Sequence, residues 1–163
     1  MEAGDISPAD LGRFWAKVNK TSECWDWTAM TERGGYGRFR IHPDRAGRMA
    51  LAHRVSYVIA HGALDDALEL DHVCFNTRCV RPEHLRPVTA GENRQHRKGA
   101  TAKSKSGVRG VRWYPRSKSW RAEVTLDSKK FHVGLFETIE DAEQAVIAKR
   151  NELFTHNNLD RVA

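Results

Sequence analysis

The sequence predicts an α+β fold divided into two small domains. Strand-like and helix-like segments alternate up to about residue 96, with helices indicated at 7–18 and about 50–61. Three alternating segments followed by one capped helix predict a three-stranded antiparallel sheet packed on that helix in the second domain. Between the two parts, residues 97–107 lack apolar periodicity and have the composition of a linker. We therefore expect domains at 1–96 and 108–163, joined by a basic linker at 97–107.

The elements of the first domain are indicated by their end signals. Ser7 can cap the first helix, and Gly62 is a natural end for the second. Residues 68–73 have the pattern of a short strand, which a tight loop at 74–79 follows. A capping box at 89–92 then starts a short helix. We thus expect this strand, this loop and this helix to lie around one common site.

The sheet of the second domain is expected to have two different faces. Its strands are predicted at about 108–114, 119–126 and 130–135, and successive side chains of a strand point to opposite sides. One face is apolar and can cover the final helix. The other face carries cations and hydrogen-bonding side chains: Arg112, Tyr114, Arg121, Glu123, Thr125, Lys130 and His132. Such a face suits the major groove of duplex DNA, although a solvated face would alternate in the same way.

The formal net charge of +6 is concentrated in one segment. Residues 97–132 contain 11 Lys and Arg against two acids, whereas residues 1–96 contain 13 of each kind. A basic patch of this kind indicates a protein that binds a polyanion, because neutralised phosphates release their counterions. The alternative is a solvated linker.

The composition is typical of a soluble protein. No apolar run approaches the roughly 20 residues that span a bilayer, so a membrane partner is not expected. The chain has three cysteines, an odd number. Its N-terminus lacks the basic and apolar regions of a signal peptide. We therefore expect a reducing cytosol, in which disulfides are rare. Small domains in a chain of 163 residues would also gain stability from a structural metal.

Two cysteines and a histidine are spaced to bind one metal ion. Cys74, Cys79 and His84 offer two thiolates and an imidazole that a single Zn²⁺ can collect. Cys24 is the only cysteine left to complete a tetrahedral set. Because all four positions would be filled by protein, this single zinc per chain would be structural. The alternative is unligated thiols or a disulfide between Cys74 and Cys79.

His72 and Asn93 are the candidate catalytic residues. His72 stands two positions before Cys74, at the end of the expected strand, where an imidazole can accept a proton from water near neutral pH. Asn93 lies on the short capped helix and offers a carbonyl oxygen suited to Mg²⁺. Alone, each residue type is more often structural or solvated. Their combination with the zinc framework predicts a nuclease site.

These residues resemble the active site of HNH endonucleases of the ββα-metal type, and in particular that of the His-Cys box homing endonucleases. The resemblance is carried by the motif His72-x-Cys74-x4-Cys79-x4-His84 with Asn93, and it extends to small phage HNH proteins. It implies a ββα-metal domain with a structural zinc, in which His72 is the general base and Asn93 is a ligand of the catalytic Mg²⁺.

The same resemblance, which spans about residues 11–96, assigns further residues. It implies Asp71 as a second ligand of the catalytic Mg²⁺, ranked below Asn93. An arginine is expected near the scissile phosphate, and the candidates are Arg38, Arg40 and Arg54. Many HNH enzymes have an Asn that orients the base at the position of His84, so here the orienting role is unassigned.

The second domain, at about 107–155, resembles the DNA-binding domain of plant ethylene-response factors. The segments that carry this resemblance are 109–112, 120–124, 133–138 and 140–142. The resemblance implies that Arg109 and the polar face of the sheet lie over the bases and phosphates of double-stranded DNA.

Together these features predict a site-directed, Mg²⁺-dependent DNA endonuclease of the phage or mobile-intron kind. It would cut with the first domain, select its target with the second, and leave 5′ phosphates and 3′ hydroxyls. We expect it in the host cytosol, associated with the nucleoid, as a monomer or a homodimer. The alternative is a DNA-binding regulator whose HNH-like module is only a zinc-bound scaffold. A nuclease directed at RNA is a weaker interpretation, because the major groove of A-form RNA is too narrow.

Overall fold

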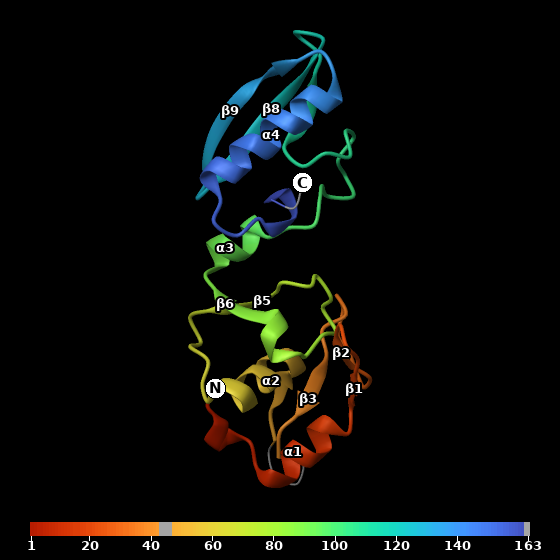
Figure 1. Cartoon of the computed structure of the whole chain (residues 1–163), viewed down its shortest axis with the longest axis vertical. Helices are drawn as coiled ribbons and strands as arrows, with labels where there is room; N and C mark the ends of the chain where they lie inside the picture. The colour runs from red at the N-terminus through yellow and green to blue at the C-terminus, as the bar shows by residue number, and fades with distance from the viewer. Residues whose placement is uncertain (43–46, 162–163) are drawn as a thin grey trace. The chain divides into compact units, whose positions relative to one another are not determined.

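The chain forms two units in a computed structural model that describes residues 1–42 and 47–161. Contacts between residues divide it into Met1–Thr89 and Ala90–Ala163 (Figure 1). Each unit has its own hydrophobic core.

The first unit combines short antiparallel strand pairs with two α-helices. Its elements are η1 (Ala3–Asp5), α1 (Pro8–Trp15), β1 (Val18–Lys20), β2 (Trp25–Trp27), β3 (Arg38–Arg40), β4 (Met49–Leu51), α2 (Ala52–His61), β5 (Glu69–His72), η2 (Pro82–His84) and β6 (Leu85–Val88). β1 pairs with β2, β3 with β4, and β5 with β6. The mixture of helices and small antiparallel sheets confirms the predicted α+β class.

α1 begins where the sequence predicts. The side chain of Ser7 accepts a hydrogen bond from the N–H of Asp10 at 3.2 Å, and the carboxylate of Asp10 accepts one from the N–H of Ser7 at 3.3 Å. This capping box satisfies two backbone donors that the helix leaves without partners. Asp10 is buried and also pairs with His42, which ties the start of α1 to the chain after β3.

The core of the first unit is built around aromatic side chains. Phe14 of α1 contacts Trp27 of β2 and Phe39 of β3, with ring centroids 5.2 Å apart in both pairs. Val55 and Val58 of α2 belong to the same fully buried cluster. Burial of these large side chains supplies much of the driving force for folding and fixes β2 against α1 and β3.

The strand that carries Asp71 and His72 follows α2. α2 ends at His61 and is capped by Gly62, as predicted, where a φ of 88° favours glycine. β5 and β6 pair so that Asp71 lies opposite Arg86 and His72 opposite Leu85. His72 is therefore the last residue of its strand, as expected.

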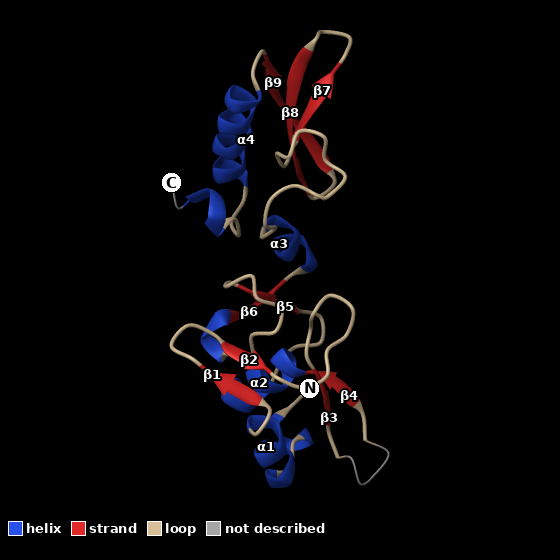
Figure 2. Ribbon diagram, turned by 90° about the vertical axis from the view of Figure 1, so that its right-hand side faces the viewer, coloured by secondary structure: helices blue, strands red, loops and turns tan. Residues whose placement is uncertain are grey.

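The second unit is a three-stranded antiparallel sheet with one long helix against it (Figure 2). Its elements are α3 (Ala90–Gln95), β7 (Val111–Tyr114), β8 (Ser119–Leu126), β9 (Lys129–Phe136), α4 (Ile139–Leu153) and η3 (Asn158–Arg161). The strand order is β7-β8-β9. None of the helices in the described ranges has the length and apolar character needed to cross a bilayer.

The strand register confirms the two predicted faces of this sheet. Val111 and Ala122 are paired and buried in the core that α4 covers. Arg112 and Arg121 are the next pair and point to the opposite face. Trp113, expected on the covered face, is 46% exposed, because it lies on the edge strand β7, where its ring packs on Trp120.

The border between the units lies at Thr89, before α3. The expected domain limits of 1–96 and 108–163 stay predictions. Residues 162–163, the last two of the expected second domain, lie outside the described residues.

Candidate metal centre and active site

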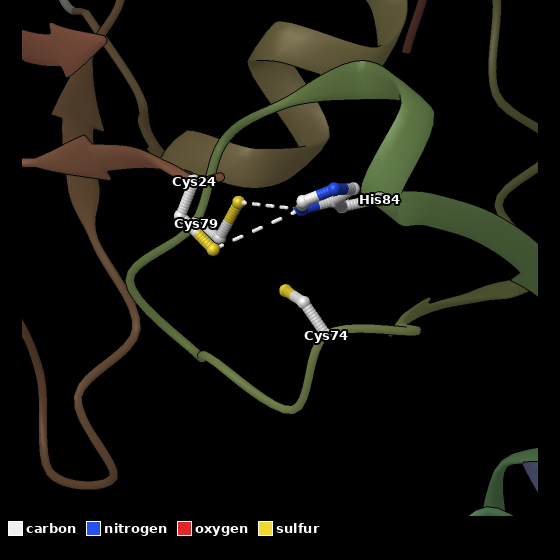
Figure 3. Close-up of side chains that lie close together, drawn as sticks. All are labelled: Cys24, Cys74, Cys79 and His84. Atoms are coloured by element: carbon white, nitrogen blue, oxygen red, sulfur yellow. Dashed lines mark hydrogen bonds between the residues drawn. The ribbon is translucent and has the colours of Figure 1, made fainter. Parts of the chain in front are cut away.

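The four side chains predicted to bind zinc converge in the first unit (Figure 3). One ligand atom from each of Cys24, Cys74, Cys79 and His84 lies within 4.8 Å of all the others. His84 Nδ1 is 3.8 Å from Cys24 Sγ and 3.6 Å from Cys79 Sγ. The three cysteines are free thiols, so Cys74 and Cys79 do not form the disulfide that the sequence left open.

These distances fit a tetrahedral zinc site. Zn–S bonds of about 2.3 Å and Zn–N bonds of about 2.0 Å place sulfur and nitrogen ligands roughly 3.6 Å apart. Both S···N distances to His84 agree with this spacing. Three thiolates and an imidazole are also a donor set that structural zinc sites use. The cluster can therefore hold a metal such as zinc with no position left for a substrate.

Strand pairing assembles the cluster from distant parts of the sequence. β2 forms two backbone hydrogen bonds with residues 78–80, of 2.9 and 2.7 Å. They place Cys24, which precedes β2, beside Cys79. Cys74 and His84 come from the β5–β6 connection, whose ends are joined by a backbone hydrogen bond of 2.9 Å. The metal would thus join segments that are 60 positions apart in the chain.

Burial makes the free thiols of the cluster hard to ionise. It raises the pKa of Cys79 to about 12 and the pKa of Cys74 above its usual value. A bound metal ion reverses this preference, because a coordinating thiol is deprotonated. The backbone N–H of Arg81, 3.5 Å from Cys79 Sγ, adds a donor to the thiolate. Metal binding and folding of this loop are therefore expected to be coupled.

His72 is oriented by the same loop. It is 5% exposed, and its Nε2 lies 3.0 Å from the backbone carbonyl oxygen of Cys79. Because a carbonyl oxygen only accepts, Nε2 carries the proton of the neutral ring and Nδ1 keeps its lone pair. Burial lowers the pKa of His72, which favours this neutral form. A main-chain carbonyl thus orients the ring of His72, a contact for which no side chain could be assigned from the sequence.

Two aromatic side chains that the sequence did not mark as site residues pack on His72. The ring centroids of His53 and Tyr36 lie 4.8 and 5.9 Å from that of His72. His53 Nδ1 is buried without a hydrogen-bond partner in the described chain, and burial lowers the pKa of His53 to about 3. His53 stands in the first turn of α2, where helical periodicity alone does not reveal a contact with another histidine.

Asp71 is engaged by an arginine of the neighbouring strand. Arg86 Nε donates to Asp71 Oδ2 at 2.9 Å, and Arg86 Nη2 lies 2.8 Å from the same oxygen. Asp71 is buried, so this ion pair offsets part of the cost of burying its charge. Its role as a metal ligand stays a prediction, and Arg86 competes with a metal for that oxygen.

Asn93 lies on α3 and therefore belongs to the second unit. Its amide oxygen is a hard donor of the kind that Mg²⁺ prefers. The assignment of Asn93 as a metal ligand stays a prediction.

The three candidate arginines of the first unit differ in their partners. Arg38 Nη1 pairs with Glu32 Oε2 at 3.0 Å. Arg54 donates to a backbone carbonyl at 3.2 Å and pairs with Asp66 at 3.3 Å. Arg40 is exposed and forms no ion pair with any residue in the described part of the chain. Of the three, Arg40 is therefore the one whose guanidinium has no ion-pair partner among the described residues.

Cations gather on the polar face of the sheet in the second unit. Glu123 pairs with both Arg112 and Arg121, at 2.7 Å in each case. The other predicted residues of this face, also brought together by the register, are Tyr114, Thr125, Lys130 and His132. The lining of a surface hollow of about 320 Å³ beside them includes the basic residues Arg97, Arg109, Arg112 and Lys130, together with Glu123 and small or apolar residues.

Arg109 differs from the other predicted DNA contacts. Its guanidinium donates to the backbone carbonyls of Gln95 at 2.8 Å and Arg94 at 3.0 Å. Burial lowers the pKa of Arg109 to about 10. Its side chain is thus bonded to the end of α3, and its contact with DNA stays a prediction.

Part of the chain is similar to known proteins. Residues 50–95 match the family model described as HNH endonuclease, and this segment contains His72, Asn93 and three of the four predicted zinc ligands. The chain is 33% identical over 73 residues to "Protein 2.8" of Escherichia phage T7, an alignment that covers 45% of this chain and 48% of the phage protein. The chain thus spans about half the length of the curated relative that it matches. No solved structure matches the chain.

Proposed function

We propose, from the HNH endonuclease match over residues 50–95, that this protein is a metal-dependent DNA endonuclease. One observation carries the proposal: the imidazole of His72 is held at 3.0 Å by the carbonyl of Cys79, inside the matched segment and beside the four-ligand cluster. A ring fixed in this way, with an available lone pair on Nδ1, has the properties of a general base.

The proposed reaction is hydrolysis of a phosphodiester bond. His72 Nδ1 takes a proton from a water molecule, whose oxygen attacks the phosphorus in line with the 3′ oxygen. The bond between phosphorus and the 3′ oxygen breaks, which leaves a 5′ phosphate and a 3′ hydroxyl. The hydrogen bond from Nε2 to Cys79 keeps the ring in place and stabilises the imidazolium that forms.

We propose Mg²⁺ as the catalytic metal and zinc as a structural one. Asn93, with Asp71 second, would hold Mg²⁺ through oxygen donors. When bound, the ion supplies stabilisation for the negative charge that develops on the phosphate and the leaving 3′ oxygen. Asn93 ranks first because its neutral amide offers a carbonyl oxygen, whereas Asp71 Oδ2 is already paired with Arg86 and would have to be shared with the ion.

Double-stranded DNA is the proposed substrate, and site-directed cutting of the homing kind is the proposed activity. The excess of Lys and Arg in residues 97–132 and the basic sheet face support binding to a polyanion. Arg112 and Arg121 would contact base edges or phosphates from this face. In the first unit, Arg40 is the preferred candidate for the scissile phosphate because it is exposed.

A second candidate function is a DNA-binding regulator in which the first unit is only a metal-bound scaffold. It is favoured by the burial of His72 and by the ion pair that occupies Asp71. The two functions make different predictions for incubation with DNA. A regulator binds and leaves the strands intact, whereas the endonuclease cuts them.

The test is cleavage of a plasmid library by the purified protein with Mg²⁺ or with a chelator, followed by mapping of the ends. The endonuclease should cut only when Mg²⁺ is added and should leave 5′ phosphates and 3′ hydroxyls at recurrent sites. Intact plasmids under both conditions, together with DNA binding, would favour the regulator instead.

A further inference from the structure

The end of α3, the helix that carries Asn93, is bonded to the segment that follows α4. Gln95 is 8% exposed, and its Oε1 accepts hydrogen bonds from the backbone N–H of Thr155 at 2.9 Å and that of His156 at 3.2 Å. The hydroxyl of Thr155 is a third donor to this oxygen, at 3.4 Å. One buried acceptor therefore holds the end of α3 against the C-terminal part of the second unit.

Arg109 makes a second attachment at the same end of α3. Its two bonds to the carbonyls of Arg94 and Gln95 satisfy acceptors that a helix end leaves without internal partners. The carbonyl of Arg109 in turn accepts from Arg150 of α4 at 2.8 Å. Arg150 is buried and pairs with Asp160. The attachment of α3 thus continues into the sheet and the helix that form the proposed DNA-binding unit.

We propose that Gln95 is a positioning residue. By bonding the end of α3 to the segment after α4, it fixes the helix that carries the proposed metal ligand Asn93 within the second unit. This inference rests on the proposed function and adds regulation to it. Because α3 is bonded to the second unit, docking of that unit on DNA also places Asn93. Cutting is then coupled to target binding, and DNA that the second unit does not hold is a poor substrate even where the first unit can reach it.

The chemistry of Gln95 allows a sharp test. Only its Oε1 is used in these bonds, as an acceptor, so Glu at this position keeps the acceptor while Leu removes it at similar size. Leu would leave the N–H groups of Thr155 and His156 without their acceptor. Gln144, exposed on α4, offers a matched control for the change from Gln to Leu.

The experiment compares wild-type protein with the variants Gln95→Leu, Gln95→Glu and Gln144→Leu. Hydrogen exchange of the amides of residues 90–95 reports the attachment of α3 without any need for activity. Single-turnover cleavage over a range of Mg²⁺ concentrations reports the placement of Asn93, and DNA affinity without Mg²⁺ reports the integrity of the second unit.

Gln95→Leu should exchange these amides faster and should need more Mg²⁺ for half-maximal cleavage, each by about tenfold, with DNA affinity unchanged. Gln95→Glu and Gln144→Leu should resemble wild type. The inference is overturned if Gln95→Leu leaves exchange and Mg²⁺ dependence unchanged, or if it loses DNA affinity as well, which would show a general structural role. A wild-type protein that cuts no DNA would instead overturn the proposed function, and the exchange data alone would then decide whether Gln95 holds α3.

Discussion

Among individual residues, Cys79 contributes two different atoms to the site, and only the sulfur could be predicted from the sequence. Its sulfur belongs to the four-ligand cluster, and its carbonyl oxygen accepts the hydrogen bond from His72. The proposed general base is therefore oriented by the main chain of a proposed metal ligand. A change that frees the loop around Cys79 should also free the ring of His72, so the proposed structural metal and the proposed general base are physically linked.

The pair formed by Asp71 and Arg86 should contribute to the stability of the first unit. Arg86→Met removes a charged partner of a buried carboxylate, so the free energy of unfolding should fall by about 2–4 kcal/mol. Urea denaturation followed by tryptophan fluorescence measures the change. Arg40→Met, at an exposed position, serves as the control and should change stability by less than about 0.5 kcal/mol. Equal effects of the two substitutions would show that the ion pair has no special role.

Between elements, the four-ligand cluster joins β2 to the connection between β5 and β6, and the proposed structural metal therefore predicts a local effect of metal removal. A strong chelator should disrupt the first unit, because buried thiols without a metal no longer hold these segments together. The sheet and α4 of the second unit have a separate core and should stay folded. Two-dimensional NMR spectra before and after chelation measure this, and loss of signals from both units together would contradict it.

Substitution of a single ligand should act in the same direction. His84→Ala should lower the zinc content from about one per chain and should lower the melting temperature. His61→Ala, an exposed histidine at the end of α2, is the matched control and should keep its zinc. Metal analysis of the purified proteins is the measurement. Wild-type protein without zinc would show that the four-ligand cluster holds no structural zinc.

Across the whole chain, the excess of positive charge is concentrated in residues 97–132. The exposed cations of the sheet face should therefore account for most of the salt dependence of DNA binding. Lys130→Gln should reduce the slope of log K against log salt by about one, because one phosphate contact is lost. Lys149, paired with Glu152 on α4, provides the control Lys149→Gln, which should leave the slope unchanged. Titrations at several salt concentrations measure both. The same slope for Lys130→Gln and wild type would mean that DNA does not lie on this face.

The sequence predicted those features that depend on spacing and periodicity. The set of Cys24, Cys74, Cys79 and His84 was predicted from ligand chemistry, and the structure brings these residues together. The capped start of α1 and the two faces of the three-stranded sheet were likewise confirmed. These features depend on residues near in sequence or on a small number of possible ligands.

Features that depend on main-chain atoms or on tertiary contacts could not be predicted. The acceptor for His72 is a backbone carbonyl, which every residue has and which no pattern marks. The partner of Asp71 depends on the register between β5 and β6. The hydrogen bonds from Arg109 to the end of α3 likewise form only in the folded second unit. The charge pattern of the sequence would look the same if this arginine were exposed.

The assignment of His72 as general base is decided by one comparison of wild-type protein with His72→Ala. Single-turnover cleavage of plasmid DNA with Mg²⁺ is measured together with DNA affinity and zinc content of the same preparations. We expect cleavage to fall at least about 100-fold, while affinity and zinc content stay at the wild-type level. Cleavage by His72→Ala at the wild-type rate would contradict the assignment, and with it the proposed mechanism.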